Sequence, residues 1–71
     1  MTDKYIELNA FLKVNSLAAT GGKAKLLIRS GVILVNGEVE LRNKRKLRAG
    51  DVMLYQGKKF VVEDSILREK P

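Results

Sequence analysis

The 71-residue sequence contains no cysteine and no histidine. Without cysteine the chain forms neither disulfides nor thiolate zinc sites. Without histidine it lacks the commonest general base, the commonest metal ligand and the side chain that titrates near neutral pH. No apolar run exceeds four residues, far short of the roughly 20 that cross a bilayer as a helix. The start of the chain shows no secretory signal, so we expect a cytoplasmic protein.

Aromatic residues are also few, at 6% of the chain, and they lie in apolar patterns. We expect Phe11 and Phe60 in the core, and Tyr5 and Tyr55 in the core or packed at a sheet edge. A binding mode in which single-stranded bases stack on aromatic side chains is therefore poorly supported.

The acidic residues do not form a catalytic set. Glu38 and Glu40 alternate along a predicted strand and share one of its faces. Without histidine, cysteine or a further acidic partner they make a weak case for a metal site or an acid–base pair. Asp51 follows Gly50 and is interpreted as a turn residue. We therefore expect no enzymatic activity, no metal ion and no cofactor.

Positive charge is what the sequence has in excess. Fourteen Lys and Arg against eight Asp and Glu give a net charge of +6, and the segment from Lys23 to Arg48 carries all of that excess. A basic excess in one contiguous part of a chain predicts a basic face whose partner is a polyanion. The alternative is a solubilising surface without a partner.

The densest part of this segment, residues 42–48, holds five positive charges in seven residues. Like charges this close repel one another unless a polyanion compensates them. When such cations neutralise the phosphates of a nucleic acid, counterions are released, and this release favours binding. We expect a solvated loop here, with a short strand around Arg45 to Leu47. Replacing Arg45 and Lys46 with glutamate should then leave the fold intact.

Two helices are predicted in the first half of the chain. Residues 7–14 have apolar residues at helical spacing, and Asn15-Ser16 ends that pattern. Thr20 is a good N-cap for a second helix that runs to about Ser30, and Gly31 stops it. Its buried stripe is formed by Ala24, Leu27 and Ile28. Lys25 and Arg29 point away from that stripe.

The first turn of this second helix contains Gly21 and Gly22, followed by Lys23. Backbone N–H groups in a first turn lack helical partners and lie at the positive end of the helix dipole. A phosphate could therefore approach the backbone closely there. The alternative is that the two glycines only permit a tight bend between the helices.

The second half of the chain has strand periodicity. Residues 32–35 and 38–41 flank Asn36-Gly37, the strongest short signal for a type I′ hairpin. Residues 52–55 and 59–63 form a further strand pair across Gln56 to Lys58. Ile66 and Leu67 are candidates to dock as a short turn, and the last residues of the tail 64–71 are expected to be loose. The fold class is α+β, with two short helices packed on a small antiparallel sheet.

Several segments occur in an order that is typical of a known family. They are residues 22–31 (GKAKLLIRSG), 32–37 (VILVNG) and 47–52 (LRAGDV), preceded by residues 6–13 (IELNAFLK). Together they resemble the S-four RNA-binding domain, whose pattern runs through a helix, A-x-x-L-I-x-x-G-x-V-x-V-N-G, a basic stretch and G-D. The resemblance spans about residues 5–63, and Gly21-Gly22 is similar to a stand-alone bacterial subgroup.

The resemblance implies the αL motif, in which structured RNA binds along the second helix and the basic loop. Family members often have Ser-Arg where this chain has Thr20-Gly21, and that arginine often contributes to RNA binding. Lys23, Lys25 and Arg29 are candidates to replace it. The domain often accompanies pseudouridine synthase or aminoacyl-tRNA synthetase domains, and the sequence holds neither.

The sequence therefore predicts a single RNA-binding domain, residues 1–71 with a core at about 5–63, that acts as a monomer. Its expected partner is structured RNA, ribosomal RNA or tRNA, with the ribosome as a candidate assembly and no small-molecule substrate or membrane. The expected RNA-binding residues are Lys23, Lys25, Arg29, Arg42, Lys44, Arg45, Lys46 and Arg48, with backbone contacts at Gly21 and Gly22. The main alternative is a protein-interaction module that docks an acidic partner, and DNA or an anionic membrane is a weaker one.

Overall fold

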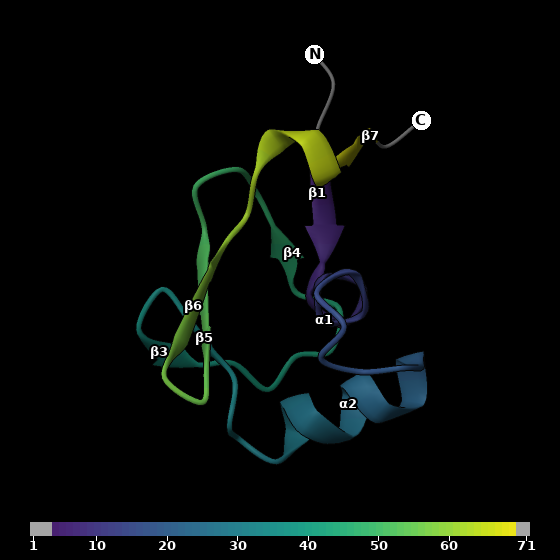
Figure 1. Cartoon of the computed structure of the whole chain (residues 1–71), viewed down its shortest axis with the longest axis vertical. Coiled ribbons are helices and arrows are strands. Elements are labelled where there is room, and N and C mark those ends of the chain that lie inside the picture. Colours follow the sequence, from purple (N-terminus) through teal and green to yellow (C-terminus); the bar gives the residue numbers. More distant parts are fainter. Residues whose placement is uncertain (1–3, 70–71) are drawn as a thin grey trace.

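Two helices and two small antiparallel sheets make up the computed structural model, which describes residues 4–69 (Figure 1). The elements are β1 Lys4–Glu7, α1 Leu8–Val14, α2 Gly21–Arg29, β2 Leu34–Val35, β3 Glu38–Val39, β4 Lys46–Leu47, β5 Val52–Tyr55, β6 Lys58–Val61, the 3₁₀ turn η1 Asp64–Ile66 and β7 Arg68–Glu69. The predicted α+β class is confirmed. None of the helices in the described part is long and apolar enough to cross a membrane.

Helix α1 presents its predicted apolar face to the interior, where Leu8, Phe11 and Leu12 are buried. It ends at Asn15, whose side-chain amide donates to the carbonyl oxygen of Phe11 (2.8 Å). The chain then reverses at Ser16, which has a positive φ of 60°. This reversal brings the next helix back against α1.

Helix α2 begins where the sequence predicts. The Thr20 hydroxyl accepts a hydrogen bond from the backbone N–H of Lys23 (3.2 Å), which satisfies one of the unpaired donors of the first turn. Ala24 and Ile28 are fully buried and Leu27 is half-buried, so the predicted stripe is confirmed. The chain leaves the helix through Gly31 at φ 81°, a conformation that favours glycine.

The larger sheet has the strand order β3-β2-β5-β6 and is built from two hairpins. Leu34 pairs with Val39 in the first hairpin and with Leu54 of β5. Asn36 and Gly37 both have positive φ (52° and 86°), as the predicted type I′ turn requires. In the turn between β5 and β6, Gln56 and Gly57 also have positive φ angles (51° and 78°).

Strands β2 and β3 are each two residues long, shorter than the predicted 32–35 and 38–41. Pairing continues beyond β3 through one hydrogen bond, from the N–H of Glu40 to the carbonyl oxygen of Ile33 (3.0 Å). The ladder then stops because Glu40 turns its carboxylate inward and binds arginines that follow it in the chain.

The smaller sheet has the order β4-β1-β7 and ties both ends of the described chain together. Ile6 pairs with Leu47, and Tyr5 pairs with Arg68. The short strand expected around Arg45 to Leu47 is present as β4. The expected docking of Ile66 and Leu67 as a short turn is confirmed, because η1 is such a turn and both side chains pack against the core. The expectation that the last residues are loose is wrong for residues 68 and 69, which pair with β1 as β7. Residues 70 and 71 lie outside the described residues.

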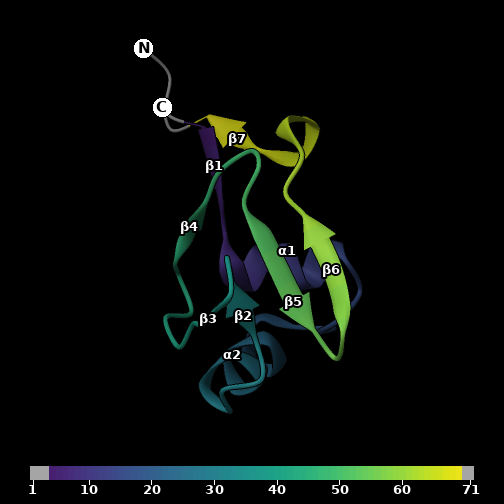
Figure 2. The same cartoon turned by 90° about the vertical axis from the view of Figure 1, so that its left-hand side faces the viewer.

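The hydrophobic core lies between the helices and one face of the larger sheet. In Figure 2 that sheet faces the viewer and α1 lies behind it. The largest fully buried side chains come from both layers and are Phe11, Leu8, Leu12, Ile28, Ile33, Leu47, Met53, Val35 and Val62. Phe60 is half-buried against this core. The described part of the chain therefore forms two layers around one core.

The first prediction concerns the turn at Gly37. A valine there would be forced into a positive φ, which is strained for a β-branched residue. We expect Gly37→Val to lower the free energy of unfolding by about 1–3 kcal/mol in urea denaturation. Gly21→Ala is the control, because no atom lies within 4 Å of its added methyl group, and an equal loss in both variants would contradict the turn assignment.

Candidate nucleic-acid interface

The basic segment, defined as residues 42–46, is held against the start of α1 by its own backbone. The N–H of Leu8 donates to the carbonyl oxygen of Arg45 (2.8 Å), and the N–H of Asn9 donates to that of Asn43 (3.1 Å). The first N–H groups of a helix have no partners within the helix, so these carbonyls satisfy them. The segment is therefore docked on a helix end rather than free in solvent.

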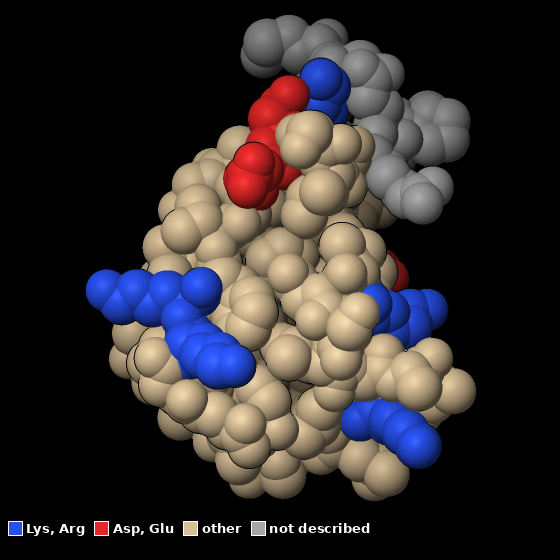
Figure 3. Space-filling view, in the orientation of Figure 1, with Lys and Arg blue, Asp and Glu red and all other residues tan. Residues whose placement is uncertain are grey.

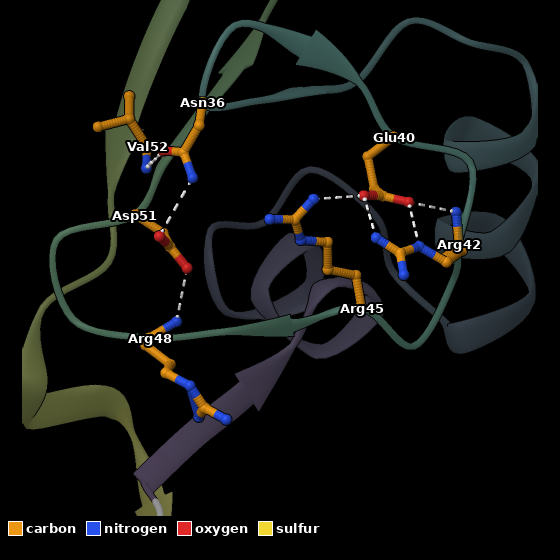
Figure 4. A network of polar contacts seen from close by, with 7 residues as sticks. All are labelled: Asn36, Glu40, Arg42, Arg45, Arg48, Asp51 and Val52. Carbon is orange, nitrogen blue, oxygen red and sulfur yellow. Dashed lines mark hydrogen bonds and ion pairs between the residues drawn. The ribbon is translucent and has the colours of Figure 1, made fainter.

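Glu40 lies at the centre of this arrangement with only 6% of its surface exposed (Figure 4). Its Oε2 accepts from the backbone N–H and the Nε of Arg42, both at 2.9 Å. Its Oε1 accepts from Nη2 of Arg42 (3.2 Å) and from Nη1 of Arg45 (2.7 Å). One buried carboxylate thus fixes two arginines through charge-assisted hydrogen bonds.

These hydrogen bonds control the charge state of the group. The side-chain hydrogen bond from Arg42 is the largest cause that lowers the pKa of Glu40 from 4.5 to about 2, against the opposing effect of burial. The same contact raises the pKa of Arg42. Glu40 is therefore ionised at any physiological pH, and its hydrogen bonds to the two arginines keep their charge-assisted character over that range.

The far end of the basic segment is fixed by a different contact. The ammonium of Lys46 lies 4.8 Å from the centre of the Tyr5 ring on the neighbouring strand β1, a favourable cation–π distance. Tyr5 is half-buried on β1, the central strand of the smaller sheet, and not at a sheet edge. Its ring supports a cation in the basic segment.

A second polar network ties together the two turns that flank the basic segment (Figure 4). Asp51 accepts from the backbone N–H of Arg48 (2.8 Å) and from the side-chain amide of Asn36 (3.2 Å). The side-chain oxygen of Asn36 accepts from the N–H of Val52 (3.0 Å). Asp51 is thus a turn residue, as predicted, and it connects the Asn36-Gly37 turn to the start of β5.

Arg42, Lys44, Arg45 and Lys46 line an open hollow of about 620 Å³, which we call the basic hollow. Among the described residues 4–69, those that line it are all basic. In both Figure 1 and Figure 2 the segment joining β3 to β4 passes beside α2. The face shown in Figure 3 carries few Lys and Arg side chains and a broad uncharged area. The hollow is therefore a local concentration of charge.

The remaining predicted site residues lie on α2 and after β4. Lys23, Lys25 and Arg29 are exposed on α2, and Gly21 and Gly22 form its first turn with open space beside Gly21. Arg48 is exposed beyond β4, and its backbone is bound by Asp51. The structure thus brings four of the eight predicted cations into one hollow and places three more on the neighbouring helix.

The expectation of a uniformly solvated loop is wrong for Arg45. Its side chain is only 30% exposed and is paired with buried Glu40, whereas Lys44 is exposed. The role of Glu40 was not predicted from the sequence. The expectation that Glu38 and Glu40 share one face of a strand is wrong, because Glu38 is exposed and Glu40 is buried, while Val39 and Leu41 are also exposed. The usable signal was the two arginines that follow Glu40 closely in the chain and can compensate its charge.

The second prediction compares how substitutions of Arg45 and Lys44 change the free energy of unfolding. Arg45→Glu would set a second carboxylate against buried Glu40, and we expect it to lower the free energy of unfolding by about 3 kcal/mol or more. Lys44→Glu makes the same change of charge at an exposed position and should change that free energy by less than about 0.5 kcal/mol. Urea denaturation of both variants measures the difference, and equal stability would show that Arg45 has no structural role.

The third prediction follows from the pKa of Glu40. The folded pKa of about 2 lies below the ordinary 4.5, so the stabilisation is complete above pH 4.5 and is lost as the pH falls to 2. We expect this loss to be on the order of 2 kcal/mol. Glu40→Gln removes the titrating group, so its unfolding free energy should fall less over that pH range. Identical pH profiles in urea titrations would contradict the assignment.

Comparison with known proteins agrees with this architecture. A family model described as the S4 domain matches residues 1–63. A Bacillus subtilis protein named as a probable ribosome maturation protein, RlbA, is 40% identical over 52 residues, which cover 73% of each chain. An Escherichia coli protein named as a putative RNA-binding protein, YbcJ, is 34% identical over 53 residues, which cover 75% of this chain and 76% of its own. The chain described here belongs to the S4 domain family.

Proposed function

We propose that this protein binds folded RNA, ribosomal RNA or tRNA, through the basic hollow and the exposed face of α2. The observation that carries the proposal is that the described residues lining the hollow are all basic, and that the segment to which they belong is docked on α1 through the carbonyls of Asn43 and Arg45. Membership of the S4 domain family supports it, as do the names of the two relatives, one a probable ribosome maturation protein and one a putative RNA-binding protein.

The hydrogen bonds that dock the backbone of the basic segment on α1 favour a folded RNA over a flexible strand as the ligand. Cations held at fixed positions match phosphates that are themselves fixed in space, and a stem–loop or junction presents such an array. The aromatic residues offer little for stacking, because Phe11 is buried, Phe60 and Tyr55 pack against the core, and Tyr5 already supports Lys46. Recognition through phosphates is therefore favoured over stacking on single-stranded bases.

Helix α2 extends the proposed surface. Lys23, Lys25 and Arg29 are exposed on it, and Gly21 and Gly22 leave the backbone of its first turn open to a phosphate. We include these five residues, together with Arg48, in the proposed interface. The protein acts in this proposal as a cytoplasmic monomer without enzymatic activity, and the ribosome is its candidate site of action.

The fourth prediction tests this proposal by titrating a stem–loop and an unstructured strand of equal length at several salt concentrations. With about four to six phosphates neutralised, the slope of log K against log salt should be roughly −3 to −5. The stem–loop should bind more tightly than the strand at every salt concentration. Equal affinity for both would indicate a nonspecific polycation, and tight binding with a flat salt response would contradict the phosphate model.

Matched variants locate the interface in the same titration. Lys44→Glu in the basic hollow and Lys25→Glu on α2 should each weaken stem–loop binding and reduce the steepness of the salt slope by about one. Lys59→Glu makes the same change of charge on β6, at an exposed position of the larger sheet. Equal weakening by Lys59→Glu would show that net charge, rather than the proposed surface, determines the affinity.

A further inference from the structure

We propose that Glu40 is a positioning residue of the RNA-binding surface. It holds the guanidinium groups of Arg42 and Arg45 in the arrangement that receives the phosphates of a folded RNA. This inference rests on the proposed function and adds to it a role for an acidic residue. A carboxylate, which repels RNA by its charge, thereby strengthens the binding of folded RNA.

The burial of Glu40 is the first observation behind this proposal. Among the described side chains of residues 4–67, that of Glu40 is the only charged one that is buried. A buried charge requires strong compensating contacts, and here Arg42 and Arg45 supply four hydrogen bonds of 2.7–3.2 Å. The contacts join Glu40 specifically to two of the four residues that line the basic hollow.

The second observation is that both arginines keep donors for a ligand. A guanidinium carries five N–H donors. Arg42 uses its Nε and Nη2 toward Glu40, and its side chain is 74% exposed. Arg45 uses its Nη1 and is 30% exposed. Glu40 therefore orients both guanidinium groups, and each carries N–H donors beyond those that bind Glu40. The high exposure of Arg42 leaves its further donors open to phosphate oxygens.

Pre-organisation explains how this arrangement raises affinity. A free arginine loses side-chain freedom when it binds a phosphate, and that loss weakens binding. Arginines already fixed by Glu40 have lost much of that freedom on folding. For two side chains the expected gain in affinity for a rigid phosphate array is about tenfold. A flexible polyanion, which adapts to any arrangement of cations, gains little from it.

The test compares Glu40→Gln with Glu38→Gln. Both substitutions raise the net charge by one, and both lie in or directly after β3, but Glu38 is exposed. Electrostatics alone predicts that both variants bind RNA at least as tightly as the wild type. The positioning role predicts that Glu40→Gln binds the stem–loop about tenfold more weakly than Glu38→Gln. Both variants should bind heparin, a flexible polyanion, at least as tightly as the wild type.

The outcomes separate this inference from the proposed function. Absence of stem–loop binding by the wild type would overturn the proposed function itself. Wild-type binding together with equal or tighter binding by Glu40→Gln would overturn only the positioning role. Weaker binding of both the stem–loop and heparin by Glu40→Gln would also overturn it, because a general loss of affinity does not depend on the arrangement of the arginines.

A second variant covers the case in which Glu40→Gln does not fold, as judged by circular dichroism. Arg42→Lys keeps the charge at a largely exposed position, but an ammonium cannot reproduce the bidentate contact with Glu40. It should therefore lose stem–loop affinity by a similar factor while keeping its affinity for heparin. Unchanged stem–loop affinity in Arg42→Lys would overturn the proposal.

Discussion

Mutual repulsion among closely spaced cations is the constraint that the rest of this structure has to satisfy. Five positive charges within residues 42–48 favour a swollen, mobile loop. Two kinds of contact oppose that tendency. The carbonyls of Asn43 and Arg45 accept from the first N–H groups of α1, and the carboxylate of Glu40 binds both neighbouring arginines. Helix α1 and Glu40, which directly follows β3, thus hold the basic segment in place while its cations stay near one another.

The two short turns around the basic segment have a related role. Asp51 and Asn36 join the first hairpin to the start of β5, so the turn between β2 and β3 and the point at which the chain enters β5 are fixed relative to each other. The cation of Lys46 rests on the Tyr5 ring between these points. A domain of this size has a thin core, and such polar links determine the shape of its surface loops more directly than apolar packing does.

The sequence predicted the features that depend on local interactions. The cap at Thr20, the stripe of Ala24 and Ile28, and the Asn36-Gly37 turn all arise from residues close together in the chain, and the structure confirms each one. The burial of Glu40 and the pairing of Arg68 with Tyr5 depend on partners that only the fold brings together. The run of basic residues in the sequence therefore predicted where positive charge accumulates. It could not show which of its arginines bind a carboxylate of the same chain.

The placement of β1 between β4 and β7 has a consequence for the order of folding. The hairpins β2–β3 and β5–β6 join neighbouring residues, but Ile6 meets Leu47 and Tyr5 meets Arg68 only after long loops have closed. Loop closure of this kind slows folding, because its entropy is lost before the contacts form. The basic segment is docked on α1 beside this sheet, so the shape of the surface that carries the positive charge depends on contacts between residues far apart in the chain.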